Sequence, residues 1–340
     1  MHRRRRAKFL PKNNLEQPTA LKWEYLEQPM KISYRFPVVI AVLLATAAAL
    51  IAQRGGGPLQ RDPIPAGSRV QYKTFHSTLV NRDLNYAIYL PPSYEASTKK
   101  YPVLYFLHGL NENEMRWSTR GGADAVLDKM VAEGKIGEFI VAIPAVDSTS
   151  FYTNARGGGA PWEDVVVKEF IPMVESTYRV NAARASRAIS GISMGGYGSL
   201  KIAMKHPEMF SAVSAHSAAL IPSFDSTTVS GQRLEAFKMI FDRIYGINFA
   251  GPQDLTYWEA NNPLTLAKDT ARLQGMKIYF DCGTEDNYGF YEGHKALDAL
   301  LTKASYPHDA HLYPGVHGWD FAKQHIDQSL LFHWKSFSGN

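Results

Sequence analysis

Short apolar runs alternate with amphipathic segments from about Val70 onward, and this alternation restricts the possible folds more than any other feature. The runs VLYFL (103–107) and FIVAI (139–143) lack the polar alternation of a half-exposed strand, which is typical of strands covered on both faces. Helices between successive strands require crossover connections, and such connections produce parallel sheets. The sequence therefore predicts an α/β fold built on a doubly wound, mostly parallel sheet.

The expected elements follow from these patterns. Two strands, 70–79 and 84–90, are separated by a turn-like gap and should form an antiparallel hairpin. The other expected strands are 103–107, 139–143, 188–192, 212–215, 277–281 and 310–313, and the expected helices are 122–133, 164–178, 194–205, 291–303 and 319–337. Segment 220–269 interrupts the alternation with one helical stretch, 232–245. We expect this inserted segment to lie over the carboxyl edge of the sheet, where such insertions usually shape a substrate pocket.

Composition excludes several classes of protein. Apolar residues make up 45% of the chain and charged residues 20%, which excludes a disordered chain. Cys282 is the single cysteine, so internal disulfides and cysteine-based zinc or iron–sulfur sites are excluded. We expect neither a metal nor an organic cofactor. The net charge is +5, but residues 1–54 hold ten of the 37 basic and three of the 32 acidic residues. The rest of the chain is slightly acidic, and we therefore expect no nucleic-acid partner.

The first 52 residues are expected to be a leader with a signal peptide. Met30 is a plausible true start, since Lys31 and Arg35 form a positive region ahead of the uncharged, mostly apolar run 36–52. This order of charge, apolar run and small residues is typical of secretory signals. We therefore expect export to the periplasm or the medium. In the alternative, the run is retained as an N-terminal anchor, and a membrane would then be a partner.

A linker and one large domain are expected after the leader. Residues 53–69 are rich in glycine and proline and have no periodicity, which is typical of a linker. Residues 70–340 contain all the expected strands and helices. The sequence thus predicts a single catalytic domain over this range.

The strongest chemical signal is a G-x-S-x-G motif at 191–195, with Ser193 at its centre. An apolar strand runs into the motif and a helical pattern leaves it, which is the context that a nucleophile elbow requires. In such an elbow the serine has a strained backbone, and its hydroxyl lies at the positive end of the following helix. In the alternative, the motif is a small-residue helix start that allows close packing.

A nucleophilic serine needs a base, and the base needs an orienting acid. In doubly wound hydrolases the acid follows the serine, and it lies after a strand. The strand MKIYFDCG ends near Gly283, so we rank Asp286 first, Glu285 second and Asp281 third as the acid. In the alternative, Asp286 only begins the next helix.

The base should come after the acid, and six histidines lie beyond Asp286. His317 follows the last expected strand, in a loop that Gly315 and Gly318 make adaptable, and we assign it as the base. The others fall in helical patterns or beside the strand: His294, His308, His311, His325 and His333.

Acyl transfer also needs backbone N–H groups that bind the developing oxyanion. One donor is expected at Met194, the residue after the nucleophile, and a second at Leu110, in the loop after strand 103–107. Gly109 allows a close approach there, and His108 is expected to be structural.

Several blocks of the sequence together resemble the putative-esterase family of α/β-hydrolases. The blocks occur in the family's order: LYFLHG (104–109), SFYTN (150–154), GISMGGYGSLKIAMKHPEMFSAVSAHSA (191–218), CGTED (282–286) and PGVHGWDFAKQH (314–325). The resemblance implies an α/β-hydrolase fold. By it, Ser193, Asp286 and His317 match the triad, and Leu110 and Met194 match the oxyanion donors. The family's proline in the helix before the nucleophile strand corresponds to Pro172.

The resemblance also implies a function. Family members include feruloyl esterases, S-formylglutathione hydrolases, tributyrin-type carboxylesterases and the mycolyl-transferring antigen 85 proteins. We therefore expect a secreted serine carboxylic-ester hydrolase that forms an acyl-enzyme. Its expected substrates are short acyl or feruloyl esters, either small or linked to polysaccharide. The alternatives are an antigen 85-type acyltransferase, an S-formylglutathione-type thioesterase and a non-catalytic carbohydrate-binding protein.

Four aromatic residues are candidates for the substrate pocket: Tyr152, Trp162, Trp258 and Trp319. Their rings could stack on a sugar or on an aromatic acyl group. Buried packing is the alternative for each of them.

Overall fold

The computed structural model describes residues 62–339 except 225–230 and 274, and the side chains of 231–234 also lie outside the description. The expected leader, 1–52, and most of the expected linker, 53–69, lie outside the described residues, so both stay predictions. None of the described helices combines the length and the apolar character that crossing a bilayer requires.

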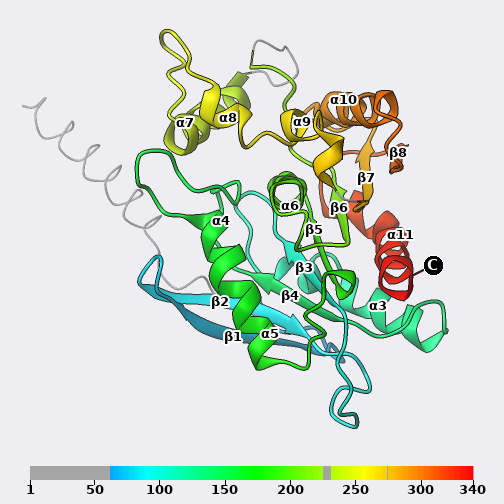
Figure 1. The fold of residues 1–340 in the computed structure, drawn as a ribbon. Coiled ribbons are helices and arrows are strands. Elements are labelled where there is room, and N and C mark those ends of the chain that lie inside the picture. Colours follow the sequence, from blue (N-terminus) through cyan, green and yellow to red (C-terminus); the bar gives the residue numbers. More distant parts are fainter. Residues whose placement is uncertain (1–61, 225–230, 274, 340) are drawn as a thin grey trace, which may run out of the picture. The chain divides into compact units, whose positions relative to one another are not determined.

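The core of the fold is an eight-stranded sheet with the order β1-β2-β4-β3-β5-β6-β7-β8 (Figure 1). Its strands are β1 (Val70–Ser77), β2 (Arg82–Tyr89), β3 (Val103–Leu107), β4 (Ile140–Pro144), β5 (Arg187–Gly191), β6 (Ala212–His216), β7 (Lys277–Gly283) and β8 (Asp309–Tyr313). Strand β2 pairs antiparallel with both β1 and β4, whereas every pair among β3 to β8 is parallel. The expected hairpin and the mostly parallel sheet are therefore confirmed.

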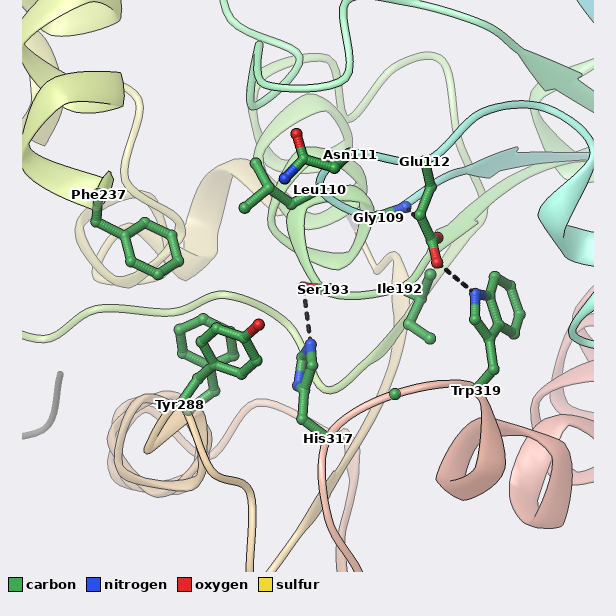
Figure 2. A pocket seen from close by; sticks show the side chains of 12 residues that line it. Gly109, Leu110, Asn111, Glu112, Ile192, Ser193, Phe237, Tyr288, His317 and Trp319 are labelled. Atoms are coloured by element: carbon green, nitrogen blue, oxygen red, sulfur yellow. Dashed lines mark hydrogen bonds between the residues drawn. The ribbon is translucent and has the colours of Figure 1, made fainter. Parts of the chain in front are cut away.

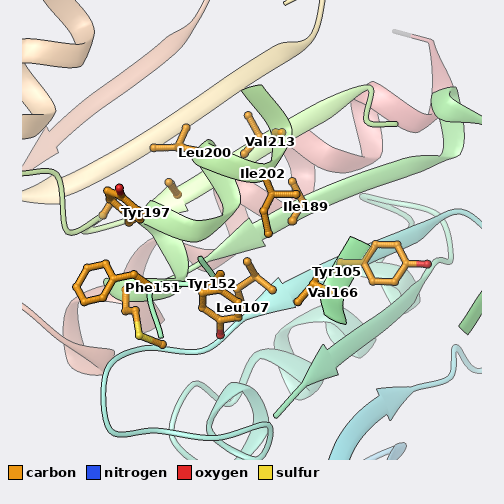
Figure 3. Packing of buried hydrophobic residues seen from close by; sticks show 14 of the residues in the cluster. Tyr105, Leu107, Phe151, Tyr152, Val166, Ile189, Tyr197, Leu200, Ile202 and Val213 are labelled. Carbon is orange, nitrogen blue, oxygen red and sulfur yellow. The ribbon is translucent and has the colours of Figure 1, made fainter. Parts of the chain in front are cut away.

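Helices cover both faces of the sheet. Helices α3 (Ala123–Ala132) and α11 (Trp319–Ser338) contribute to the buried cluster on one face, together with Leu104 and Phe106 of β3. On the other face, Tyr105 and Leu107 pack with α5 (Ile171–Thr177), α6 (Met194–Lys205) and α10 (Phe290–Lys303), as Figure 3 shows in part. Because successive residues of β3 point to opposite faces and both faces are covered, the whole strand is apolar.

The helix before β5 continues past Pro172 because its hydrogen-bond register changes. It consists of α4 (Trp162–Asp164), a π-helical stretch (Val165–Phe170) and α5. A proline has no N–H to donate, and it also crowds the carbonyl group four residues earlier. At the end of the π-helical stretch, the Ile171 N–H bonds to the Val166 carbonyl, five residues back. This wider turn accommodates Pro172, so the expected helix 164–178 forms without a break.

The inserted segment carries α7 (Gly231–Tyr245) and the short helices α8 (Thr256–Glu259) and α9 (Pro263–Leu266). Its expected helix corresponds to α7. Other short helices were not expected, namely α2 (Arg116–Thr119) and the 3₁₀ turns Arg184–Ser186 and Thr270–Leu273. Phe237 on α7 lines a cavity beside Ser193, so the insertion does border the candidate site.

Candidate active site

Ser193 lies in a sharp turn between β5 and α6. Its φ of 56° and ψ of −116° fall in a region that residues with a side chain rarely adopt. A Cβ atom on Gly191 would overlap the Gly195 carbonyl, and one on Gly195 would overlap the Leu107 carbonyl. The tightness of the turn therefore explains why both glycines of the motif are needed.

The structure brings Ser193, His317 and Asp286 together. His317 Nε2 lies 3.0 Å from Ser193 Oγ, and His317 Nδ1 lies 2.7 Å from Asp286 Oδ2. An ionised carboxylate can only accept, so the Nδ1–H donates to Asp286 and Nε2 is free to accept the serine proton. Asp286 is itself fixed, because its Oδ1 accepts the Tyr288 N–H at 2.8 Å. The contacts form one chain from acid to base to hydroxyl.

The lower-ranked candidates for the acid lie elsewhere. Glu285 is exposed, while Asp281 is buried and bonds to His216 at 2.8 Å and to the Tyr279 hydroxyl at 3.0 Å. The other five histidines are occupied differently. His308 contacts Asp298, His333 contacts Ser214, His294 packs on Phe280, and His311 and His325 stack on Tyr313.

Asp281 and His216 belong to a second serine–histidine–aspartate array. His216 Nε2 lies 2.9 Å from Ser329 Oγ, and its Nδ1 lies 2.8 Å from Asp281 Oδ2. The three side chains are 1–2% exposed, and none of them lines the cavity beside Ser193. Without access for a substrate, this array can brace the ends of β6 and β7 but cannot meet an ester.

The two residues expected to supply the oxyanion donors are both close to Ser193. Met194 follows it directly, and a Cβ atom on Gly109 would lie 3.6 Å from Ser193 Cβ, so the loop after β3 is close. Within the described part of the chain, the N–H groups of Leu110 and Met194 make no bond to a backbone carbonyl. Both groups are thus available to a ligand. His108 is buried, and burial lowers its pKa to about 4, which suits a structural residue.

A cavity of about 190 Å³ opens beside Ser193 and His317 (Figure 2). Phe237 and Tyr288 lie on one side of the Ser193–His317 pair, and Glu112 and Trp319 lie on the other. The lining residues are Gly109, Leu110, Asn111, Glu112, Ile192, Ser193, Phe237, Tyr288, Phe290, His317, Gly318 and Trp319.

Of the four aromatic residues expected in the pocket, only Trp319 lines this cavity. Tyr152 is fully buried, and its hydroxyl donates to the His108 carbonyl at 3.0 Å. Trp258 packs against Phe224, and Trp162 borders a different cavity. All three residues are buried in the core and none lines the cavity beside Ser193, which favours the alternative of packing for them. The sequence reasoning missed Glu112, Phe237, Tyr288 and Phe290, although the amphipathic pattern of 232–245 was a signal for Phe237.

A model of the family described as putative esterase matches residues 77–332. The chain belongs to this family. A solved ferulic acid esterase has a TM-score of 0.66 at 28% identity, and the match covers 79% of this chain and 99% of that one. An S-formylglutathione hydrolase from Agrobacterium tumefaciens has a TM-score of 0.64 at 18% identity, over 82% of this chain and 99% of that one, which shows the fold alone. The expected α/β-hydrolase fold is confirmed.

Two curated relatives are similar over part of their length. An endo-1,4-beta-xylanase/feruloyl esterase of Xylanibacter ruminicola is 33% identical over 42% of this chain and 20% of its own length. An esterase of Mycobacterium tuberculosis is 27% identical over 73% of this chain and 56% of its own length. The chain thus spans a fifth and about half of the lengths of these relatives.

Proposed function

We propose that the chain is a serine carboxylic-ester hydrolase in which Ser193 is the nucleophile, His317 the base and Asp286 the orienting acid. The observation that carries the proposal is the chain of contacts of 2.7 and 3.0 Å that ends at the strained serine, at the edge of a cavity. A serine at its ordinary pKa is a weak nucleophile, and an aligned histidine and carboxylate supply the activation that it needs.

Each group has a defined step in the reaction. His317 takes the hydroxyl proton as Ser193 attacks the ester carbonyl carbon, and the carbonyl oxygen becomes an oxyanion. The N–H groups of Leu110 and Met194 stabilise that oxyanion, and the loss of one such donor typically costs about 3 kcal/mol. The alcohol leaves with the proton from His317. Water then attacks the acyl-enzyme in the same way and releases the acid.

The proposed substrates are short acyl or feruloyl esters, including esters carried on carbohydrate. Phe237, Tyr288 and Phe290 give one wall of the cavity an aromatic surface, which suits an aromatic acyl group. Relatives named feruloyl esterase support the same substrates. Whether a sugar hydroxyl can replace water as acceptor is tested by product analysis with added xylo-oligosaccharide.

The replacement Ser193→Ala tests the function. We expect it to abolish hydrolysis of p-nitrophenyl acetate and methyl ferulate and to abolish labelling by a fluorophosphonate probe, with an unchanged circular dichroism spectrum. Ser329→Ala is the matched control, because Ser329 holds the corresponding place in the buried array. We expect this variant to keep its activity. Full activity of Ser193→Ala would refute the proposal.

We also propose that the protein is exported. The proposal depends on the signal-like order of charged and apolar residues in 30–52. N-terminal sequencing of the protein recovered outside the cytoplasm would test it, and recovery only in the cytoplasm, with the leader intact, would contradict it.

A further inference from the structure

Glu112 is a half-buried carboxylate in the cavity wall that the proposed mechanism does not use. Its Oε1 accepts the Trp319 indole N–H at 2.7 Å, and its Oε2 accepts the Gly109 N–H at 3.2 Å. Burial raises the pKa of Glu112, while its two hydrogen bonds and the charges of Arg116 and Arg120 favour the ionised form. Burying a carboxylate costs free energy unless both of its oxygens accept hydrogen bonds, as they do here.

The carboxylate connects two loops that serve different parts of the site. Gly109 begins the loop that carries the Leu110 N–H, and Trp319 begins α11 two residues after His317. Figure 2 shows Glu112 and Trp319 meeting beside the Ser193–His317 pair.

Trp319 is a fixed anchor for this connection. Its ring packs on Phe106 with 6.1 Å between the ring centroids, and it is 8% exposed. A Cβ atom on Gly121 would come within 2.8 Å of the indole, so the ring is also confined from that side. The indole N–H therefore holds the Glu112 carboxylate at a defined place.

The peptide groups around the Leu110 N–H are fixed on both sides. On one side, the Gly109 N–H is held by Glu112. On the other, the Asn111 N–H donates to the Ser148 carbonyl at 2.8 Å. Glycine has the largest backbone freedom, so Gly109 is where this loop would turn most easily if its N–H were released. Leu110 lies between these two fixed groups and lines the cavity beside Ser193.

We propose that Glu112 is a positioning residue, whose carboxylate ties the oxyanion loop to the start of α11 and so holds the Leu110 N–H in place for the transition state. This inference rests on the proposed esterase function. An oxyanion donor acts through its preorganisation, so a loop that can turn away should lower the rate of the chemical step more than substrate binding.

The replacement Glu112→Gln tests the proposal, because a glutamine offers one acceptor where two donors converge. One of the two N–H groups must then face the amide NH₂. We expect kcat to fall about 10- to 100-fold, part of the effect of losing an oxyanion donor outright, with KM within about threefold. Inhibition by a trifluoromethyl ketone, which forms a tetrahedral oxyanion with the serine, should weaken by the same factor as kcat/KM.

A second replacement separates positioning from a general structural role. Trp319→Phe keeps an aromatic ring at this position, although a smaller one, and removes the indole donor, so alone it should lower kcat several-fold. Combined with Glu112→Gln, it leaves the glutamine oxygen free for the Gly109 N–H. The double variant should therefore recover part of the kcat that Glu112→Gln loses.

Glu169→Gln is the matched control, because Glu169 also accepts backbone N–H groups, those of Thr78 and Leu79, at 2.8 and 3.0 Å. We expect a lower melting temperature and an unchanged kcat for it. Wild-type kcat and inhibitor affinity in Glu112→Gln, or no recovery in the double variant, would overturn the inference. If Ser193→Ala abolishes activity while Glu112→Gln does not, only this inference fails. If Ser193→Ala stays active, the proposed function fails.

Discussion

Replacing Asp286 by asparagine should disable His317 by changing the nitrogen that carries its proton. In the wild type, Asp286 Oδ1 accepts the Tyr288 N–H at 2.8 Å and Oδ2 accepts the His317 Nδ1–H at 2.7 Å. The single oxygen of an asparagine would stay on the fixed Tyr288 N–H, and its NH₂ would then face the imidazole. His317 must accept this hydrogen at Nδ1 and carry its own proton on Nε2, the atom that faces Ser193. A base in that state cannot take the serine proton.

The two possible orientations of the amide give limits for the expected loss. In the orientation above, the wrong tautomer lowers kcat by about 10⁴-fold, equivalent to about 5.4 kcal/mol. In the flipped orientation, His317 keeps its acceptor but the Tyr288 N–H faces an NH₂ group. Asp286 is 4% exposed, so water cannot compensate, and the unpaired donor costs about 1–3 kcal/mol. This cost limits how often the flipped, competent orientation is populated. We therefore expect kcat to fall at least about 5-fold and up to about 10⁴-fold.

Steady-state hydrolysis of p-nitrophenyl acetate measures this loss, with chemical denaturation to verify that the variant is folded. Glu285→Gln is the matched control, because Glu285 is the exposed neighbour of Asp286, and we expect its kcat to be unchanged. A folded Asp286→Asn variant with less than about a 5-fold loss would refute the assignment of the acid.

Two further predictions concern stability. Burial lowers the pKa of His333 to about 3, so below about pH 6.5 the unfolded chain binds a proton that the folded chain excludes. As the pH falls below this value, the free energy of unfolding should fall by up to about 1.4 kcal/mol per pH unit through this histidine alone. Urea denaturation at about pH 7 and about pH 5 measures this loss, which should be smaller in His333→Gln. Gly195→Ala should destabilise the fold by about 1–3 kcal/mol and lower kcat, because its Cβ atom would overlap the Leu107 carbonyl. Equal pH dependence in the first case, or wild-type stability in the second, would contradict these expectations.

The parts of the fold that the sequence predicted are those that short windows encode. The apolar run of β3 and the pattern of α6 were found with their observed bounds, because their burial is visible residue by residue. The order of the strands was not predicted, since a crossover helix does not say whether β4 lies inside or outside β3. Helix propensity alone would place a break at Pro172, and the wider turn that avoids the break depends on backbone register, which composition does not reveal.

The same distinction holds for the candidate site: some of its residues could be predicted from short stretches of sequence and others could not. Ser193, Asp286 and His317 could be located because each follows a recognisable strand, and the carboxyl ends of parallel strands meet at one edge of a sheet. Glu112 could not, because its partner Trp319 lies 207 residues away and no spacing links them. Tyr152 and Trp258 were assigned to the pocket on ring chemistry alone, and the same large amphipathic rings are equally suited to a core.

A search for catalytic triads that uses interatomic distances alone would also select the buried array of Ser329, His216 and Asp281. Its separations of 2.9 and 2.8 Å match those at Ser193 to within a few tenths of an ångström. What distinguishes the two is the cavity beside Ser193 and, among the described residues, the N–H groups of Leu110 and Met194, which bond to no backbone carbonyl. Structural templates for hydrolases would therefore be more selective if they required an adjacent cavity and free backbone N–H groups as well as the triad distances.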